Sequence, residues 1–325
     1  MADHDHARCS STSDHEDDTF MDAGMFEEPE AFRPPSPVAT FVEHERPADV
    51  TVGPSTLRLR LVGAHPLWGH HLWNAARVFA NYLEARAATL CRGRRVLELG
   101  AGAGLPGLVT ALHGAQRVLL TDYPDADLLD NLTMNAKSVA SDAYDAGHLA
   151  VQGYLWGADT RSLVAAVNEH DAVEAGTFDL VILSDLIFNH TEHRAMLQTV
   201  RACLSRAAGL PVTQATLSRN NEALQRIARD APCPPLPPLS ERETAAPQAL
   251  VFFSHHRPWW AARDLHFFEL AQSSSPIYGG FHVERILEEQ LQPMFAEDPG
   301  SAEVRATVHG YRLTLREHDN AMPAQ

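Results

Sequence analysis

The stretch from Arg95 to Gly107, RVLELGAGAGLPG, constrains the fold of this chain more than any other. Residues 96–99 form a short apolar run typical of a buried parallel strand, and Glu98 interrupts it with a carboxyl group that needs a partner. Four glycines follow, and residues 105–113 have the pattern of a helix. A backbone without Cβ atoms turns tightly and approaches a ligand closely, and the helix start offers free N–H groups. This order predicts a nucleotide-binding crossover.

The spacing of the glycines separates two kinds of nucleotide site. The dinucleotide fingerprint G-x-G-x-x-G fails at Leu105 when counted from Gly100, and it fits only two residues late, from Gly102. An acidic residue followed by G-x-G-x-G fits without slippage, from Glu98 to Gly104, and is the first motif of methyltransferases that use S-adenosylmethionine. A tight strand–helix turn without a ligand is the remaining alternative.

A second predicted strand, residues 117–122, ends in an acidic side chain 22 residues after Gly100. A carboxylate at this position can accept hydrogen bonds from both hydroxyl groups of a ribose. Asp122 therefore indicates a nucleoside ligand, without distinguishing NAD from S-adenosylmethionine. The alternative is that Asp122 caps the helix that starts near Asp125.

The acidic residues are concentrated at the start of the chain. The 325 residues carry a net charge of −16, and residues 1–50 hold 13 acidic residues against 3 arginines. We expect residues 1–50 to be a largely disordered acidic tail and residues 51–325 to form one domain. Within it, residues 207–248 are rich in Pro and Ala and resemble an insertion.

Composition also excludes several classes of partner. The chain has no basic stripe for nucleic acid and no apolar run of 18 residues for a membrane. It has no secretory leader, and its 4 cysteines form no C-x-x-C pair. We therefore expect a cytoplasmic, monomeric protein without a metal site.

The other apolar segments predict an α/β fold with a parallel sheet. Alternation at residues 57–62 indicates an edge strand or hairpin, and an amphipathic helix over residues 72–83 follows. Further helices and buried strands are expected at 125–137, 151–154, 179–185, 249–254 and 264–271. After residues 281–290 and a turn at 298–300, the alternating runs 304–308 and 311–315 predict an antiparallel finish.

Polar and aromatic residues stand where the predicted strands end. Trp156 follows one strand, and Ser184, Asp185, Phe188 and Asn189 follow another. Ligands of open α/β sheets bind at this edge, so we expect these residues near Gly100 and Asp122. For Asp185 the alternative role is a cap of the next helix. Trp68 lies in a loop, where it either plugs the core or contacts a ligand.

Together these motifs resemble the seven-strand S-adenosylmethionine methyltransferases. PLWGHHLWNA, VLELGAGAGLPGLV, TDYPDADL, GYLWG, VILSDLIFNHTEH, FFSHHRPWW and MFAEDPG are similar to the fungal nicotinamide N-methyltransferase-like proteins, over residues 57–316. That branch is assigned to methylation of the N-terminal glycine and adjacent lysine of translation elongation factor 1-alpha. The resemblance implies a Rossmann-like sheet of seven strands, mostly parallel with an antiparallel C-terminal hairpin.

The resemblance also implies roles for individual residues. It places these residues at the S-adenosyl-L-methionine site: Trp68, Glu98, Gly100, Ala101, Gly102, Asp122, Tyr123, Trp156 and Ser184. The acidic-x-x-aromatic motif from Asp185 to Phe188 is the one that lysine-methylating members carry, and Leu186-Ile187 departs from the Pro-Pro-aromatic motif of base and amide methyltransferases. We expect Asp185 and Asn189 to orient an amine and Phe188 to favour the growing cation.

Two other functions remain open at this point. A methyltransferase for a small amine could use the same residues. An NAD-dependent oxidoreductase, or a cofactor-binding protein without catalysis, would share the strand–glycine–helix order.

For a methyltransferase, the pKa of the acceptor amine matters, because only the neutral amine has a free lone pair. An α-amino group has a pKa of about 7.7–8.0 and a lysine side chain about 10.4, so an N-terminal amine is the easier acceptor.

Overall fold

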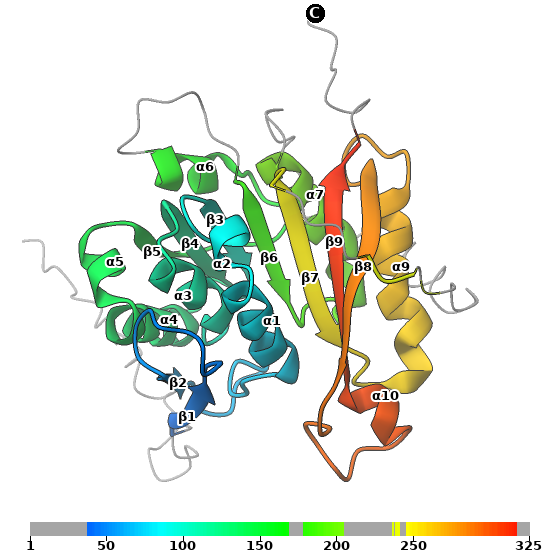
Figure 1. Cartoon of the computed structure of the whole chain (residues 1–325). Helices are drawn as coiled ribbons and strands as arrows, with labels where there is room; N and C mark the ends of the chain where they lie inside the picture. The colour runs from blue at the N-terminus through cyan, green and yellow to red at the C-terminus, as the bar shows by residue number, and fades with distance from the viewer. Residues whose placement is uncertain (1–37, 169–177, 205–235, 237, 241–244, 317–325) are drawn as a thin grey trace, which may run out of the picture. The chain divides into compact units, whose positions relative to one another are not determined.

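The computed structural model describes residues 38–168, 178–204, 236, 238–240 and 245–316. In the unit Pro37–Gln325, these residues form a seven-stranded sheet in the order β5-β4-β3-β6-β7-β9-β8 (Figure 1). The strands are β3 (Arg95–Leu99), β4 (Arg117–Asp122), β5 (Leu149–Gly153), β6 (Leu180–Ser184), β7 (Gln248–Ser254), β8 (Phe281–Gln290) and β9 (Thr307–Leu315). Strands β3 to β7 are parallel, and β9 is antiparallel to both β7 and β8. The predicted mixed Rossmann-like sheet is confirmed.

Helices cover both faces of this sheet. They are α1 (Asn74–Glu84), α2 (Ala87–Leu90), α3 (Leu105–Leu112), α4 (Ala126–Val139), α5 (Ser141–Asp145), α6 (Arg161–Asn168), α7 (His193–Leu204), α9 (Ala261–Gln272) and α10 (Ala302–Ala306). Successive side chains of a strand point to opposite faces. Accordingly Val96 packs into the core under α1, α3 and α4, whereas Leu97 packs into the core under α7 and α9.

Strands β1 (Thr40–Glu45) and β2 (Thr56–Leu61) form a separate antiparallel pair. Leu57 and Leu59 of β2 are fully buried against the core that holds α1 and α3. The pair corrects the expected boundary, because residues 40–45 fall inside the range 1–50 that we expected to be a tail. Residues 1–37 and most of the 207–248 stretch lie outside the described residues, so the expectations for them stay predictions.

The C-terminal part differs from the expectation in one respect. Residues 304–306 lie in α10, where the Ser301 side chain accepts a hydrogen bond from the N–H of Val304 at 3.4 Å. The two predicted strands are therefore one helix and one strand, β9, whose antiparallel partner is β8. An alternating run of five residues fits one helical turn as well as a strand, and the N-cap decides the difference here. None of the described helices is long and apolar enough to cross a bilayer.

The parallel order fixes where a site can form. Strands β3, β4, β6 and β7 all run in one direction, so their carboxyl ends meet at one edge of the sheet. In the sheet, β4 and β5 lie on one side of β3, and β6 and β7 lie on the other. The strand order therefore reverses at β3, which leaves a crevice at that edge. The glycine loop and the residues after β6 both open onto it.

Candidate active site

The loop between β3 and α3 needs glycine at two positions for different reasons. Gly100 has φ +57°, and a Cβ there would lie 2.7 Å from Leu186 Cδ2 and 3.1 Å from Trp156 Cζ2. Gly102 has φ +55°, and the space beside its Cα is open. The first glycine allows the loop to pack against the residues after β6. The second leaves bare backbone facing open space, where a ligand can approach closely.

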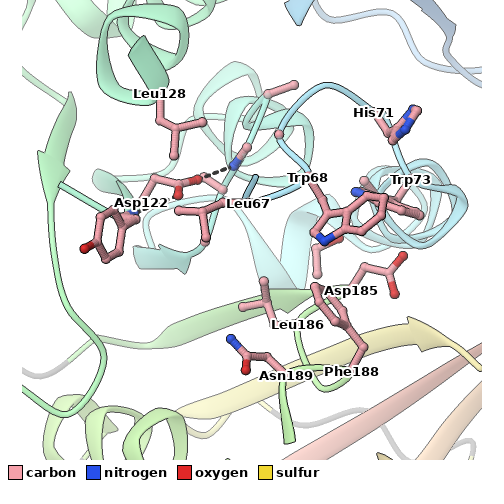
Figure 2. Close-up of a pocket in the computed structure, with 18 of the residues that line it drawn as sticks. Leu67, Trp68, His71, Trp73, Asp122, Leu128, Asp185, Leu186, Phe188 and Asn189 are labelled. Atoms are coloured by element: carbon pink, nitrogen blue, oxygen red, sulfur yellow. Dashed lines mark hydrogen bonds between the residues drawn. The ribbon is translucent and has the colours of Figure 1, made fainter. Parts of the chain in front are cut away.

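Asp122, at the end of β4, holds this loop in place. Its Oδ2 accepts a hydrogen bond from the N–H of Gly102 at 2.7 Å, and its Oδ1 accepts one from Tyr123 N–H at 2.7 Å (Figure 2). Burial raises the pKa of the Asp122 carboxyl more than these two hydrogen bonds lower it. Asp122 does not cap α4, because Asp125 is the N-cap and accepts from the N–H groups of Asp127 and Leu128.

Glu98 has a different place from the one expected. Its side chain is fully buried beneath the loop and does not line the cavity described below. Its Oε2 accepts a hydrogen bond from the N–H of Gly107 at 2.9 Å, and burial raises the pKa of Glu98 to about 8. The expectation that Glu98 contacts the cofactor is therefore corrected: it ties the start of α3 to β3 and supports the loop from below.

A cavity of about 600 Å³ opens at this edge of the sheet, a usual size for a cofactor site. All the other predicted site residues line it: Trp68, Gly100, Ala101, Gly102, Asp122, Tyr123, Trp156, Ser184, Asp185, Phe188 and Asn189. They come from five separate parts of the chain, which only the fold brings together. Figure 2 shows Asp122 on one side of this space and Trp68, Asp185 and Phe188 on the other.

The cavity fits S-adenosylmethionine in its donor and acceptor groups. Gly102 presents bare backbone, and Asp122 keeps lone pairs for ribose hydroxyl groups beside its two backbone bonds. The Ser184 Oγ is buried without a hydrogen-bond partner among the described residues, so it is available to a polar ligand atom. The Trp156 ring packs against Gly100 and supplies an apolar wall for a base.

The backbone is strained at two positions of this cavity. Within the described residues, Trp68 with φ +62° and Asp185 with φ +58° are the non-glycine residues with positive φ. Such conformations cost about 1–3 kcal/mol each and cluster at functional sites. Both residues line the cavity, so the strained backbone lies at its wall.

Asp185 is bonded to a residue for which the sequence predicts no role. The Asp185 carboxylate accepts from His256 Nε2 at 3.0 and 2.9 Å, and from the N–H of Ser254 at 3.4 Å. Burial lowers the pKa of His256, but the charge and hydrogen bonds of Asp185 outweigh it, so the pKa is raised. The alternative role as helix cap finds no support, because the hydrogen bonds that the Asp185 carboxylate accepts from described residues come from His256 and Ser254 and not from the first turn of α7.

The two remaining predicted catalytic residues flank Asp185. Phe188 is 41% exposed, an unusual exposure for a Phe, and lies at the cavity mouth. The Asn189 Oδ1 accepts a hydrogen bond from Thr191 Oγ1 at 3.1 Å, which leaves its amide N–H groups as donors to a ligand. The Asn189 amide can therefore donate hydrogen bonds to a ligand in the cavity, and the Asp185 carboxylate can accept them.

A second cavity of about 330 Å³ adjoins the first, and Trp68, Trp73 and Phe188 line both. His256 lines the second cavity and Asp185 the first, so their hydrogen bond lies between the two. The sequence could have indicated this cavity through the motifs PLWGHHLWNA, FFSHHRPWW and MFAEDPG, which contain most of its lining residues.

The chain is similar to known proteins over most of its length. Residues 56–226 match the family model described as lysine methyltransferase. The chain is 41% identical over 299 residues to "Protein N-terminal and lysine N-methyltransferase efm7" of Schizosaccharomyces pombe, covering 92% of this chain and 98% of that protein. The protein of the same name in Eremothecium gossypii is 40% identical over 310 residues, covering 93% and 98%.

Among solved structures, a putative SAM-dependent methyltransferase from Streptococcus mutans is similar with a TM-score of 0.43 and 11% identity, covering 79% of this chain and 53% of that one. The family match makes the NAD-dependent alternative wrong and makes S-adenosylmethionine the methyl donor. This chain belongs to the lysine methyltransferase family, together with the fungal proteins named protein N-terminal and lysine N-methyltransferase.

Proposed function

We propose that this enzyme methylates the N-terminal glycine and the adjacent lysine of translation elongation factor 1-alpha. The names of the fungal relatives support an N-terminal amine and a lysine as acceptors. The motif resemblance from residue 57 to residue 316 supports the elongation factor as the protein that carries them. We further propose that it acts as a monomer in the cytoplasm, where that factor works.

The Asp185–His256 pair is the observation that carries this proposal. An amine acceptor is protonated in water and must expose its lone pair before it can react. Asp185 is only 4% exposed and lines the first cavity, next to His256 in the wall of the second. A buried carboxylate there accepts N–H groups of an amine, and His256 keeps it oriented from behind.

The other residues complete the acceptor position. When bound, S-adenosylmethionine would supply a sulfonium methyl group for transfer to the lone pair of a neutral amine. Asp185 fixes the direction of the amine lone pair by holding its N–H groups. Phe188 and Trp68 surround the position with aromatic faces, which favour the positive charge that grows on the amine.

The direct test uses the full chain with purified elongation factor 1-alpha and labelled S-adenosylmethionine. We expect methyl groups on the N-terminal glycine and on the adjacent lysine, located by mass mapping of the N-terminal peptide. A factor acetylated at its N-terminus should lose glycine methylation, because an amide has no usable lone pair. Labelling of nicotinamide with none on the factor would instead establish a small-amine methyltransferase.

Asp185→Asn separates the role of the carboxylate from cofactor binding. Asn has nearly the same shape and tolerates positive φ, so the loop should keep its conformation. We expect an unchanged dissociation constant for S-adenosylmethionine and a turnover number lower by about two orders of magnitude, because the amine loses its anionic acceptor. The matched control is Asp159→Asn, whose partner Arg161 lies on the surface. Parental turnover in Asp185→Asn would contradict the proposed role.

A further inference from the structure

The second cavity is walled by aromatic side chains, some of them shared with the first cavity and some not. Its residues are Trp68, Trp73, Phe188, His190, His256, Arg257, Trp260, Asp264, Phe295 and Asp298. Phe295, Trp260 and Asp298 line this cavity and not the first. They come from the segments after β7 and β8, far from the glycine loop in sequence.

Trp73 is the centre of these rings. Its ring centroid lies 6.5 Å from that of Trp68 and 6.1 Å from that of Phe295, and both pairs are edge-to-face. The ring of His256 lies 4.8 Å from it on another side. Rings arranged at steep angles around one space, instead of stacked on each other, are the geometry of an aromatic cage for a cation.

Asp298 gives the wall of this cavity a carboxylate that can attract a cationic occupant. Asp264 is buried and already paired, with His190 Nε2 and His255 Nδ1 each 2.6 Å from its carboxylate. Asp298 is exposed and forms no hydrogen bond or ion pair with any residue that the structure describes. The guanidinium groups of Arg257 and Arg263 lie 4.7 and 5.0 Å from the Trp260 ring centroid, so that ring already contacts two cations.

We propose that this second cavity binds methylated ammonium groups at the N-terminal end of a polypeptide. The inference rests on the proposed function, which makes such a group the product of this enzyme. A trimethylammonium group keeps its charge but donates no N–H hydrogen bond, so aromatic faces recognise it better than polar side chains do. Trp68, Trp73 and Phe188 are shared with the first cavity, so a methylated amine leaves Asp185 without leaving aromatic surroundings.

The test compares two peptides that differ in one atom. The probes are trimethylglycyl-Lys-Ala-Ala-Ala-amide and its 3,3-dimethylbutanoyl analogue, in which carbon replaces the quaternary nitrogen. Binding to the full chain is measured by calorimetry and by tryptophan fluorescence, with S-adenosylhomocysteine present and no methyl donor. We expect the charged peptide to bind at least tenfold more tightly. Equal affinity for the two peptides would overturn the proposal.

Two variants locate the binding in this cavity. Phe295→Leu should weaken binding of the charged peptide about threefold to fivefold and leave the neutral analogue unchanged. Phe41→Leu, at an exposed ring stacked on Arg58 of β2, is the matched control and should change neither. S-adenosylhomocysteine affinity should stay parental in both, because neither residue lines the first cavity. Equal weakening in both variants would contradict the assignment.

Asp298→Asn provides a variant that cannot disturb the core, because this side chain is exposed. It should weaken binding of the charged peptide only, and most strongly at low salt.

Failure of the proposed function would give a different pattern of results. If elongation factor 1-alpha is not methylated but the charged peptide is still preferred, the cavity assignment stands and the substrate is another protein. If the factor is methylated and the two peptides bind equally, only the cavity assignment fails.

Discussion

Replacing Glu98 by Gln should change how the stability of this protein depends on pH. Glu98 is fully buried between β3 and α3, and the one hydrogen bond of its carboxyl group to a described residue comes from the N–H of Gly107. Its Oε1 has no partner among the described residues. Burial and the nearby charge of Asp122 raise the pKa of Glu98 from 4.5 to about 8, so the folded protein keeps this carboxyl protonated at neutral pH.

The direction of this pH dependence follows from the number of protons that the folded and the unfolded protein bind. Between pH 4.5 and 8 the unfolded chain releases the Glu98 proton and the folded protein keeps it, so the free energy of unfolding decreases as pH rises. One pKa unit corresponds to about 1.4 kcal/mol, so the contribution of Glu98 should fall by about 4 kcal/mol between pH 5 and pH 9. Gln does not titrate, so Glu98→Gln should lack this decrease.

The assay is urea unfolding of the wild type and Glu98→Gln at each pH from 5 to 9. The difference in free energy of unfolding between the two proteins should shift by about 4 kcal/mol across this range, in favour of the variant at high pH. Glu45→Gln, on the exposed side of β1, is the matched control and should show no such shift. A shift below about 1 kcal/mol would refute the argument that burial keeps Glu98 neutral.

Three further predictions concern the cofactor site, the residue behind Asp185 and the N-terminal part. Asp122→Asn should raise the dissociation constant of S-adenosylmethionine at least tenfold in calorimetry, since a charged acceptor contributes about 1.5–3 kcal/mol. His256→Asn should lower the turnover number about tenfold with that dissociation constant unchanged, because Asp185 loses its oriented donor; an unchanged turnover number would exclude the role. Deletion of residues 1–37 should leave the melting temperature unchanged. Deletion of residues 1–50 removes β1 and the buried Arg46–Glu84 pair, and should lower the melting temperature in calorimetry by about 10 °C.

Most of the fold follows from patterns within short stretches of the chain. Val96, Leu97 and Leu99 are fully buried, as an apolar run between turn residues predicts for a parallel strand. The observed β4 has the predicted bounds, Arg117–Asp122. The N-terminal strand was missed because residues 40–45 alternate weakly and lie in a strongly acidic region. Its pairing with β2, and not its own composition, makes it a strand.

In the candidate site, too, some residues follow from local sequence patterns and others only from the fold. Gly100, Gly102 and Asp122 could be assigned from the sequence, because backbone approach and ribose recognition each need one residue type at one spacing. Glu98 belongs to the same motif, yet its side chain lies under the loop. Alternate residues of β3 face opposite sides of the sheet, and the packing of α3 decides which of these sides is buried.

The sequence alone determined the strand–glycine–helix unit, the parallel sheet and the residue types at its carboxyl edge, because each depends on neighbours a few positions apart. Only the tertiary structure decided which groups contact Asp185. His256 lies 71 residues away, and the two meet because β6 and β7 are adjacent parallel strands that end at one edge. The same folding brings Phe295 and Trp73 together into the second cavity. No local pattern encodes such contacts, since they depend on which strands pair.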